Sequence, residues 1–118
     1  MPSVLVVEDE FLVREFIVEE FGDAGFAVQS ASDGEKALEL LKSGAGFDLL
    51  FTDVRMPGSI DGWELGRHAA QMFPDIRIVY ATGYSETSHA LNDNEGFLTK
   101  PYRMVDILEL IGGLGIRV

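Results

Sequence analysis

The sequence has no cysteine, few basic side chains and no long hydrophobic run. Without cysteine the chain forms neither disulfides nor a thiolate zinc site, which fits a reducing compartment. Nine Lys and Arg residues against twenty Asp and Glu residues leave a net charge of −11, and such a surface repels the phosphates of nucleic acids. No apolar stretch reaches the roughly 18 residues of a membrane span, and the first residues lack the basic segment of a signal peptide. We therefore expect a cytoplasmic protein that binds neither nucleic acid nor membrane.

The 118 residues, 47% of them hydrophobic, are enough for one domain with a buried core. Short β-branched runs stand at 4–7, 26–30, 48–52, 76–81 and 96–99. The first, third and fourth runs are almost wholly apolar, as is typical of parallel strands covered on both faces. Helical patterns separate the runs, so we predict an α/β fold with a (βα)5 doubly wound, parallel five-stranded sheet.

The helical segments carry recognisable boundary signals. Ser32 with Glu35 has the form of a capping box, and Asp61 with Glu64 repeats this signal before the third helix. The stretch 85–94 holds few apolar residues, so a fourth helix there should be short or mobile. Leu12, Phe16, Ile17 and Phe21 should line one face of the first helix, which is expected to end at Gly25.

Polar side chains stand where the predicted strands end, namely Glu8, Asp9, Asp53, Thr82 and Lys100. In a doubly wound sheet the ligand site lies beyond the carboxyl ends of the strands, so these groups should share one pocket. Oxygen ligands without histidine or cysteine suit Mg²⁺. A carboxylate beside a metal, a lysine and a hydroxyl can attack a phosphoryl group and form an acyl phosphate. The pattern thus indicates that Asp53 meets a metal and, at times, phosphate.

Each of these residues also has a plainer interpretation. Glu8 and Asp9 could cap the first helix, which is compatible with metal binding, and Asp53 could simply start the following turn. Thr82 could only end its strand, and Lys100 could be an ordinary surface lysine.

Four segments, VLVVEDE, FTDVRMPGSIDGWEL, YATGY and LTKPY, resemble in order the motifs of the receiver domain of two-component response regulators. The resemblance implies the flavodoxin-like, CheY-like fold and the single-domain type, with residues 1–118 as one receiver domain and no effector domain. It implies that Asp53 accepts a phosphoryl group from the phosphohistidine of a histidine kinase or a histidine phosphotransfer protein. The chain would then be no enzyme in the usual sense, since it catalyses only its own phosphoryl transfer and dephosphorylation.

The resemblance also implies roles for the neighbouring residues. Asp9 would bind Mg²⁺ directly and Glu8 through water, and Thr82 and Lys100 would bind the phosphoryl oxygens, with a cis bond between Lys100 and Pro101. The implied metal ligands are Glu8, Asp9, Asp53 and the backbone carbonyl of Arg55.

Signalling in this family implies a switch and partner surfaces. Phosphate would draw in Thr82, and Phe97 would rotate into the vacated space; without a hydroxyl, Phe97 would act by packing alone. Residues 11–18 of the first helix should form much of the surface that docks the phosphodonor protein. The stretch from Thr82 to Lys100 is shorter than usual, so the oligomeric state stays open.

The output also stays open between a downstream protein partner, a relay step and a phosphate sink. A phosphate-independent pseudo-receiver is disfavoured, because the acids, the acceptor and the lysine are all present. A flavin-binding module of the same fold would need a Ser/Thr/Gly-rich loop where this chain has EDEF. A phosphatase of the haloacid dehalogenase type would need an Asp where Arg55 stands.

Overall fold

The protein is described by a computed structural model that covers residues 1–83 and 91–117. Its five strands form one parallel sheet in the order β2-β1-β3-β4-β5. The strands are β1 (Ser3–Val7), β2 (Ala27–Ala31), β3 (Leu49–Asp53), β4 (Arg77–Thr82) and β5 (Glu95–Thr99). Each predicted strand is confirmed, and its bounds differ by no more than one residue from those expected.

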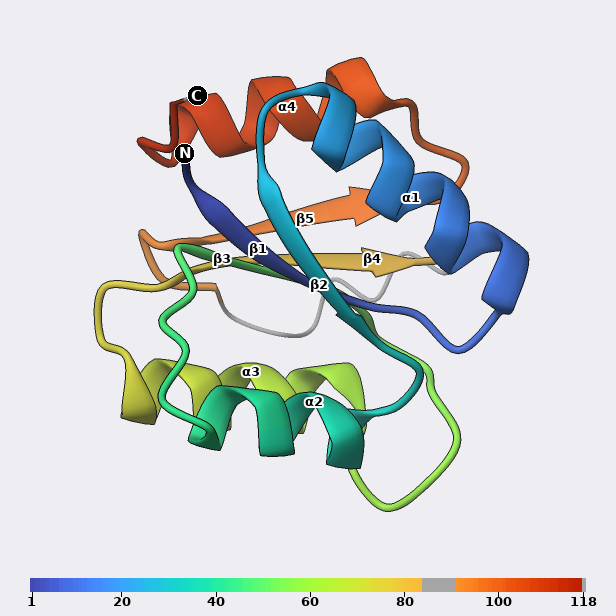
Figure 1. Cartoon of the computed structure of the whole chain (residues 1–118), viewed down its shortest axis with the longest axis vertical. Coiled ribbons are helices and arrows are strands. Elements are labelled where there is room, and N and C mark those ends of the chain that lie inside the picture. Colours follow the sequence, from blue (N-terminus) through green and yellow to red (C-terminus); the bar gives the residue numbers. More distant parts are fainter. Residues whose placement is uncertain (84–90, 118) are drawn as a thin grey trace.

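In the described part of the chain, four helices flank the sheet, two on each face (Figure 1). α1 (Phe11–Asp23) and α4 (Met104–Gly113) cover one face, whereas α2 (Gly34–Lys42) and α3 (Gly62–Met72) cover the other. The doubly wound α/β fold is therefore confirmed. The helix expected between β4 and β5 falls largely on residues 84–90, outside the described residues, and α4 corresponds to the last predicted helix. Among the described residues, none of the helices is both long and apolar enough to cross a membrane.

Two apolar layers hold the sheet between the helix pairs. Side chains of β1 and β3 alternate between them: Leu5 and Leu50 pack toward α2 and α3, and Val6 and Phe51 toward α1 and α4. β1, β3 and β4 are buried almost throughout, as the near-continuous apolar runs predicted, whereas the edge strand β2 is mostly exposed. Burial on both faces is what requires these strands to be apolar.

Only half of the predicted apolar face of α1 is buried. Ile17 and Phe21 are buried, but Leu12 is 79% exposed and Phe16 61% exposed. α1 carries apolar residues at 11–13 and 16–18, so its hydrophobic periodicity does not single out one face. The packing of the helix on the sheet determines which of these residues are buried, and it leaves Leu12 and Phe16 exposed to solvent.

Of the two capping predictions, one is confirmed and the other is wrong. Asp61 caps α3, since its Oδ1 accepts from the N–H of Glu64 at 2.9 Å. The predicted box of Ser32 and Glu35 is wrong, because Asp33 is the N-cap of α2 and accepts from the N–H of Lys36 at 2.8 Å. A carboxylate one residue later offers the same acceptor, so the helix begins one residue later.

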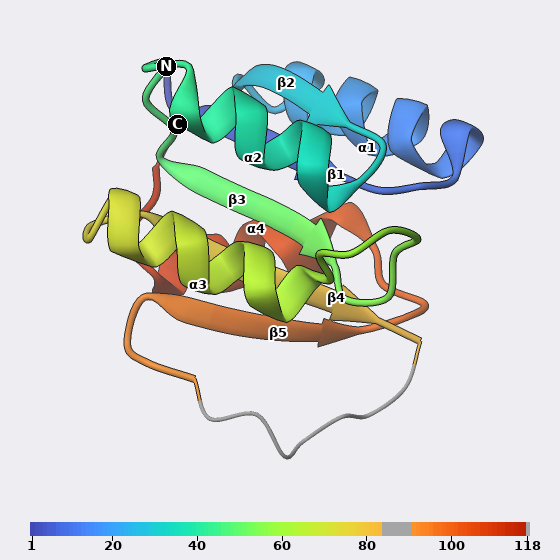
Figure 2. The ribbon, with the colours of Figure 1, turned by 90° about the horizontal axis from the view of Figure 1, so that it is seen from below.

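The order of the strands fixes where a ligand site can lie. The chain runs from β1 outward to β2 and then returns past β1 to β3, so the direction of winding reverses between β1 and β3. Figure 2 shows the carboxyl end of β3 and the long loop that leads from it to α3. The crevice at such a reversal is the usual ligand position in this architecture.

Candidate functional site

Three carboxylates meet at the carboxyl ends of β1 and β3. Glu8 and Asp9 follow β1, and Asp53 is the last residue of the neighbouring β3. One carboxylate oxygen from each lies within 4.8 Å of the others. Glu8 is 3% exposed and Asp53 is 8% exposed, while Asp9 faces solvent. The structure therefore gathers these three predicted site residues in one place.

Lys100 reaches the same place from the end of β5. Its Nζ lies 3.2 Å from Oδ2 of Asp53 and 3.6 Å from Oε1 of Glu8. Its backbone N–H donates to the carbonyl of Thr82 at 2.7 Å, and its bond to Pro101 is cis, as the resemblance implied. The interpretation of Lys100 as an ordinary surface lysine is thus wrong.

Burial and crowding shape the protonation of the cluster. Burial raises the pKa of Glu8 from 4.5 to about 7, and Asp9 and Asp53 act in the same direction. Burial likewise raises the pKa of Asp53, against the opposing charge of Lys100. Burial alone would lower the pKa of Lys100, but the charges of Asp53 and Glu8 outweigh it and raise the pKa. One ammonium group does not offset the carboxylates, so the cluster favours a further cation.

The donor set fits Mg²⁺. All three side chains offer hard carboxylate oxygens, without histidine or cysteine in the cluster. Mg²⁺ binds oxygen at about 2.1 Å, so ligands on opposite sides of the ion lie about 4.2 Å apart. Oxygens already within 4.8 Å of one another need little movement to share one ion. Since Mg²⁺ keeps several waters, a site with few protein ligands suffices.

Local hydrogen bonds hold the acids in place. Oδ1 of Asp53 accepts from the N–H of Val54 at 3.0 Å, and Oε2 of Glu8 accepts from the N–H of Glu10 at 3.1 Å. Nη1 of Arg14 donates to the backbone carbonyl of Glu8 at 2.8 Å. Glu10, not Glu8 or Asp9, is the N-cap residue of α1, and no side chain caps it. Capping is therefore not the reason for the acidic pair.

The sequence reasoning did not single out Arg14 or Tyr102. Arg14 braces the loop of the acidic pair from within α1, and Tyr102 packs edge-on against Phe51 at 5.8 Å between ring centroids. Burial, with the charges of Glu8 and Asp53, raises the pKa of Tyr102. Tyr102 ends the LTKPY motif and Arg14 lies within residues 11–18, but neither pattern showed that these side chains lie beside the acidic cluster.

The predicted switch residues lie on neighbouring strands, and one of them belongs to an aromatic stack. Thr82 is buried at the end of β4, and Phe97 is half-buried on the adjacent β5. The ring of Phe97 stacks on Trp63 of α3 with centroids 6.3 Å apart and planes 4° apart. The ring of Trp63 also contacts the ring of Tyr80, with centroids 4.3 Å apart. The Phe97 ring has no hydroxyl to form a hydrogen bond, and it packs against the Trp63 ring instead.

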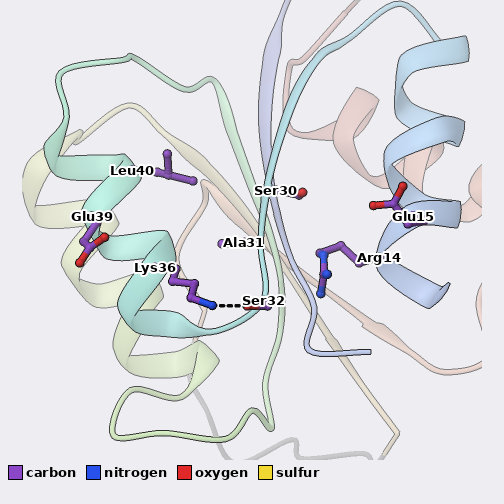
Figure 3. A pocket seen from close by; sticks show the side chains of 8 residues that line it. All are labelled: Arg14, Glu15, Ser30, Ala31, Ser32, Lys36, Glu39 and Leu40. Carbon is purple, nitrogen blue, oxygen red and sulfur yellow. Dashed lines mark hydrogen bonds between the residues drawn. The ribbon is translucent and has the colours of Figure 1, made fainter. Parts of the chain in front are cut away.

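A separate cavity of about 490 Å³ lies at the open edge of β2, between α1 and α2 (Figure 3). Arg14 and Lys36 stand on its opposite walls, and Nζ of Lys36 donates to the Ser32 hydroxyl at 3.2 Å. Glu15 and Glu39 also line it, so its charges balance. It does not include the acidic cluster, and its cations already have partners within the chain.

Sequence similarity to known proteins agrees with this geometry. The family model of the response regulator receiver domain matches residues 4–112. The response regulator receiver protein CpdR of Brucella abortus is 34% identical over 117 residues, with 94% of each chain covered. The sensor kinase CckA of the same organism is 36% identical over 107 residues, which cover 86% of this chain but only 11% of the kinase.

Solved structures give the same result. A response regulator receiver protein from Sinorhizobium medicae superposes with a TM-score of 0.89 at 33% identity, covering 96% of this chain and 93% of that one. TrrA of Thermotoga maritima, solved in complex with Mg²⁺-BeF, superposes with a TM-score of 0.84 at 31% identity, covering 97% and 99%. Together with the geometry of the acidic cluster, these matches show that the chain belongs to the response regulator receiver domain family.

Proposed function

We propose that this chain is a phosphoacceptor of two-component signalling and that Asp53 takes a phosphoryl group from the phosphohistidine of a histidine kinase or phosphotransfer protein. The observation that carries the proposal is the buried Asp53 carboxylate, which lies 3.2 Å from Lys100 and beside two further acids. The chain acts in the cytoplasm as a signalling domain whose reaction is its own phosphoryl transfer and dephosphorylation.

Asp53 is the nucleophile. One of its carboxylate oxygens attacks the phosphorus atom while the phosphorus–nitrogen bond to the donor imidazole breaks, so the imidazole leaves and then takes a proton. The product is an acyl phosphate on Asp53. Lys100 lies where its charge offsets the negative charge of the transferred group, and Thr82, at the end of the neighbouring β4, supplies a hydroxyl at the same edge.

Glu8, Asp9, Asp53 and the backbone carbonyl of Arg55 would hold Mg²⁺. Bound there, Mg²⁺ would neutralise charge on the phosphoryl oxygens and so allow two anions to approach each other. The Mg²⁺-BeF complex of TrrA, a protein of the same family, supports this assignment. Phosphate on Asp53 then draws Thr82 inward, and Phe97 follows by leaving its stack on Trp63.

The exposed apolar surface of α1 is the docking site for the donor protein. Phe11, Leu12 and Phe16 are 62%, 79% and 61% exposed, which is unusual for large apolar side chains grouped on one helix. A cavity of about 360 Å³ connects this helix with Lys100 and Tyr102 at the reactive edge. A partner seated on α1 therefore reaches Asp53 with its phosphohistidine.

The partner that reads the phosphorylated state is a downstream protein or a further phosphotransfer protein. The similarity to the receiver protein CpdR favours the first, and the similarity to a segment of the sensor kinase CckA favours a relay or phosphate-draining role. The chain itself binds no nucleic acid, since its net charge is −11.

Intact mass measured after incubation with acetyl phosphate and Mg²⁺ tests the proposal. Wild type should gain one phosphate, and Asp53→Asn should gain none because its amide is no nucleophile. Phosphate on Asp53→Asn would contradict the assignment of the acceptor. Phosphate uptake that persists in excess EDTA would contradict the role of the metal.

A further inference from the structure

One carboxylate ties the tip of the loop between β3 and α3 to α2. Oε1 of Glu35, in the first turn of α2, accepts from the N–H of Ser59 at 3.2 Å, the hydroxyl of Ser59 at 3.3 Å and the N–H of Ile60 at 3.0 Å. The donors lie 24 and 25 residues along the chain from Glu35. We refer to these three hydrogen bonds as the Glu35 bridge. They satisfy two backbone donors of a loop that forms no regular structure of its own.

The backbones on both sides of the bridge fit closely. A Cβ atom on Gly34 would lie 2.6 Å from the carbonyl oxygen of Ile60, and one on Gly58 would lie 2.5 Å from Oε2 of Glu35. Gly58 also has a φ of 100°, in the region that side chains other than glycine rarely adopt. Glycine at both positions lets α2 and the loop approach to contact distance. The Glu35 bridge therefore links two segments that are also closely packed against each other.

The loop that the bridge holds is the loop that leaves Asp53. At its neck, the N–H of Gly62 donates to the carbonyl of Val54 at 2.8 Å, which fixes the first residue after Asp53. The Glu35 bridge fixes Ser59 and Ile60 at the tip. Arg55 lies between these two attachments, so its backbone is restrained from both sides.

We propose that Glu35 is a positioning residue for the cation site, because by holding the loop tip it restrains the backbone carbonyl of Arg55. This inference rests on the proposed function, in which that carbonyl binds Mg²⁺. A ligand group that is already ordered in the free protein loses little conformational entropy on binding. Without the bridge the Arg55 peptide samples more orientations, and Mg²⁺ binds more weakly while Asp53 and Lys100 are unchanged.

The test compares Mg²⁺ binding by calorimetry in wild type, Glu35→Ala, Glu35→Gln and the matched control Glu39→Ala. Glu39 lies one turn further along α2, beside the cavity of Figure 3 and away from the loop tip that Glu35 holds. Its replacement removes the same charge from the same helix. The Kd for Mg²⁺ should rise about 5- to 10-fold in Glu35→Ala, as expected for the loss of hydrogen bonds that order the loop. It should stay within about twofold of wild type in Glu35→Gln, whose amide oxygen still accepts, and in Glu39→Ala.

Two further readouts separate positioning from a general loss of structure. At saturating Mg²⁺ the rate of phosphorylation by acetyl phosphate should return to the wild-type value in Glu35→Ala, because the reacting groups are intact. In EDTA, the amides of Ser59 and Ile60 should exchange with deuterium faster in Glu35→Ala than in wild type, since their acceptor is gone. A rate that stays low at saturating Mg²⁺ would refute the positioning role.

The outcomes distinguish this inference from the proposed function. If wild type is phosphorylated on Asp53 and Glu35→Ala keeps the wild-type Kd for Mg²⁺, only the role of Glu35 is wrong. If wild type binds Mg²⁺ but takes up no phosphate, only the proposed function is wrong, and a weaker Kd in Glu35→Ala still supports the bridge. If wild type binds no Mg²⁺, both are wrong.

Discussion

Replacing Glu8 by Gln should change how the stability of the metal-free protein depends on pH. Burial raises the pKa of Glu8 from 4.5 to about 7, so the folded chain holds this proton more tightly than the unfolded chain does. The stabilising contribution of such a group is complete below pH 4.5 and is lost as the pH rises through 7. One pKa unit corresponds to about 1.4 kcal/mol, so wild type should lose about 2 to 3 kcal/mol of unfolding free energy between roughly pH 5 and pH 8 through Glu8.

The glutamine side chain has nearly the same shape as glutamate but does not ionise, so this part of the pH dependence should disappear in Glu8→Gln. A weaker slope of the same sign should remain, because the pKa of Asp53 is also raised by burial. Urea unfolding in EDTA at about pH 5 and pH 8, followed by the fluorescence of Trp63, measures both slopes. Equal slopes in the two proteins would refute the argument that burial of Glu8 destabilises its charged form.

Mg²⁺ should restore the unfolding free energy that wild type loses as the pH rises. At about pH 8 the carboxylates are ionised and repel each other, and a bound cation removes that repulsion. Wild type should therefore gain more stability from Mg²⁺ at pH 8 than at pH 5, where binding must first displace a proton from Glu8. Glu8→Gln should gain less than wild type at pH 8. An equal gain in both proteins would mean that Glu8 takes no part in holding the ion.

Two further substitutions test the docking surface and the core. Leu12→Asp should lower the rate of phosphotransfer from a histidine kinase at least about tenfold while leaving phosphorylation by acetyl phosphate unchanged. Val105→Asp, which places the same charge at an exposed apolar position of α4, is the control. An equal effect of Leu12→Asp on both donors would contradict docking through α1. Gly66→Ala should destabilise the fold by about 2 kcal/mol despite the better helix propensity of Ala, because the new Cβ would overlap the Tyr80 hydroxyl and lie 2.7 Å from its Cζ. Gly22→Ala in α1, which has open space around it, should instead be neutral or stabilising in the same urea titration, and a neutral Gly66→Ala would refute the tight packing.

Much of the fold follows from local patterns. Parallel strands covered on both faces must be apolar, so the runs that became β1, β3 and β4 were visible in the sequence to within one residue. The rule that ligand sites lie at the carboxyl edge then brought Glu8, Asp53 and Lys100 together, because each of them directly follows or ends a strand. The family motifs carry the same residues.

Other features depended on how the elements pack. The apolar residues of α1 are spread too widely around the helix to show which of them face the sheet, and only packing put Leu12 and Phe16 in solvent. The stack of Phe97 on Trp63 and the Glu35 bridge join side chains from separate elements. Local sequence encodes the tendency to form a strand or a helix, whereas the distance between two side chains on different elements depends on the relative placement of both. The sequence thus determined the strands, the acidic cluster and the family, and the tertiary structure alone decided which surface of α1 is exposed and which residues brace the site.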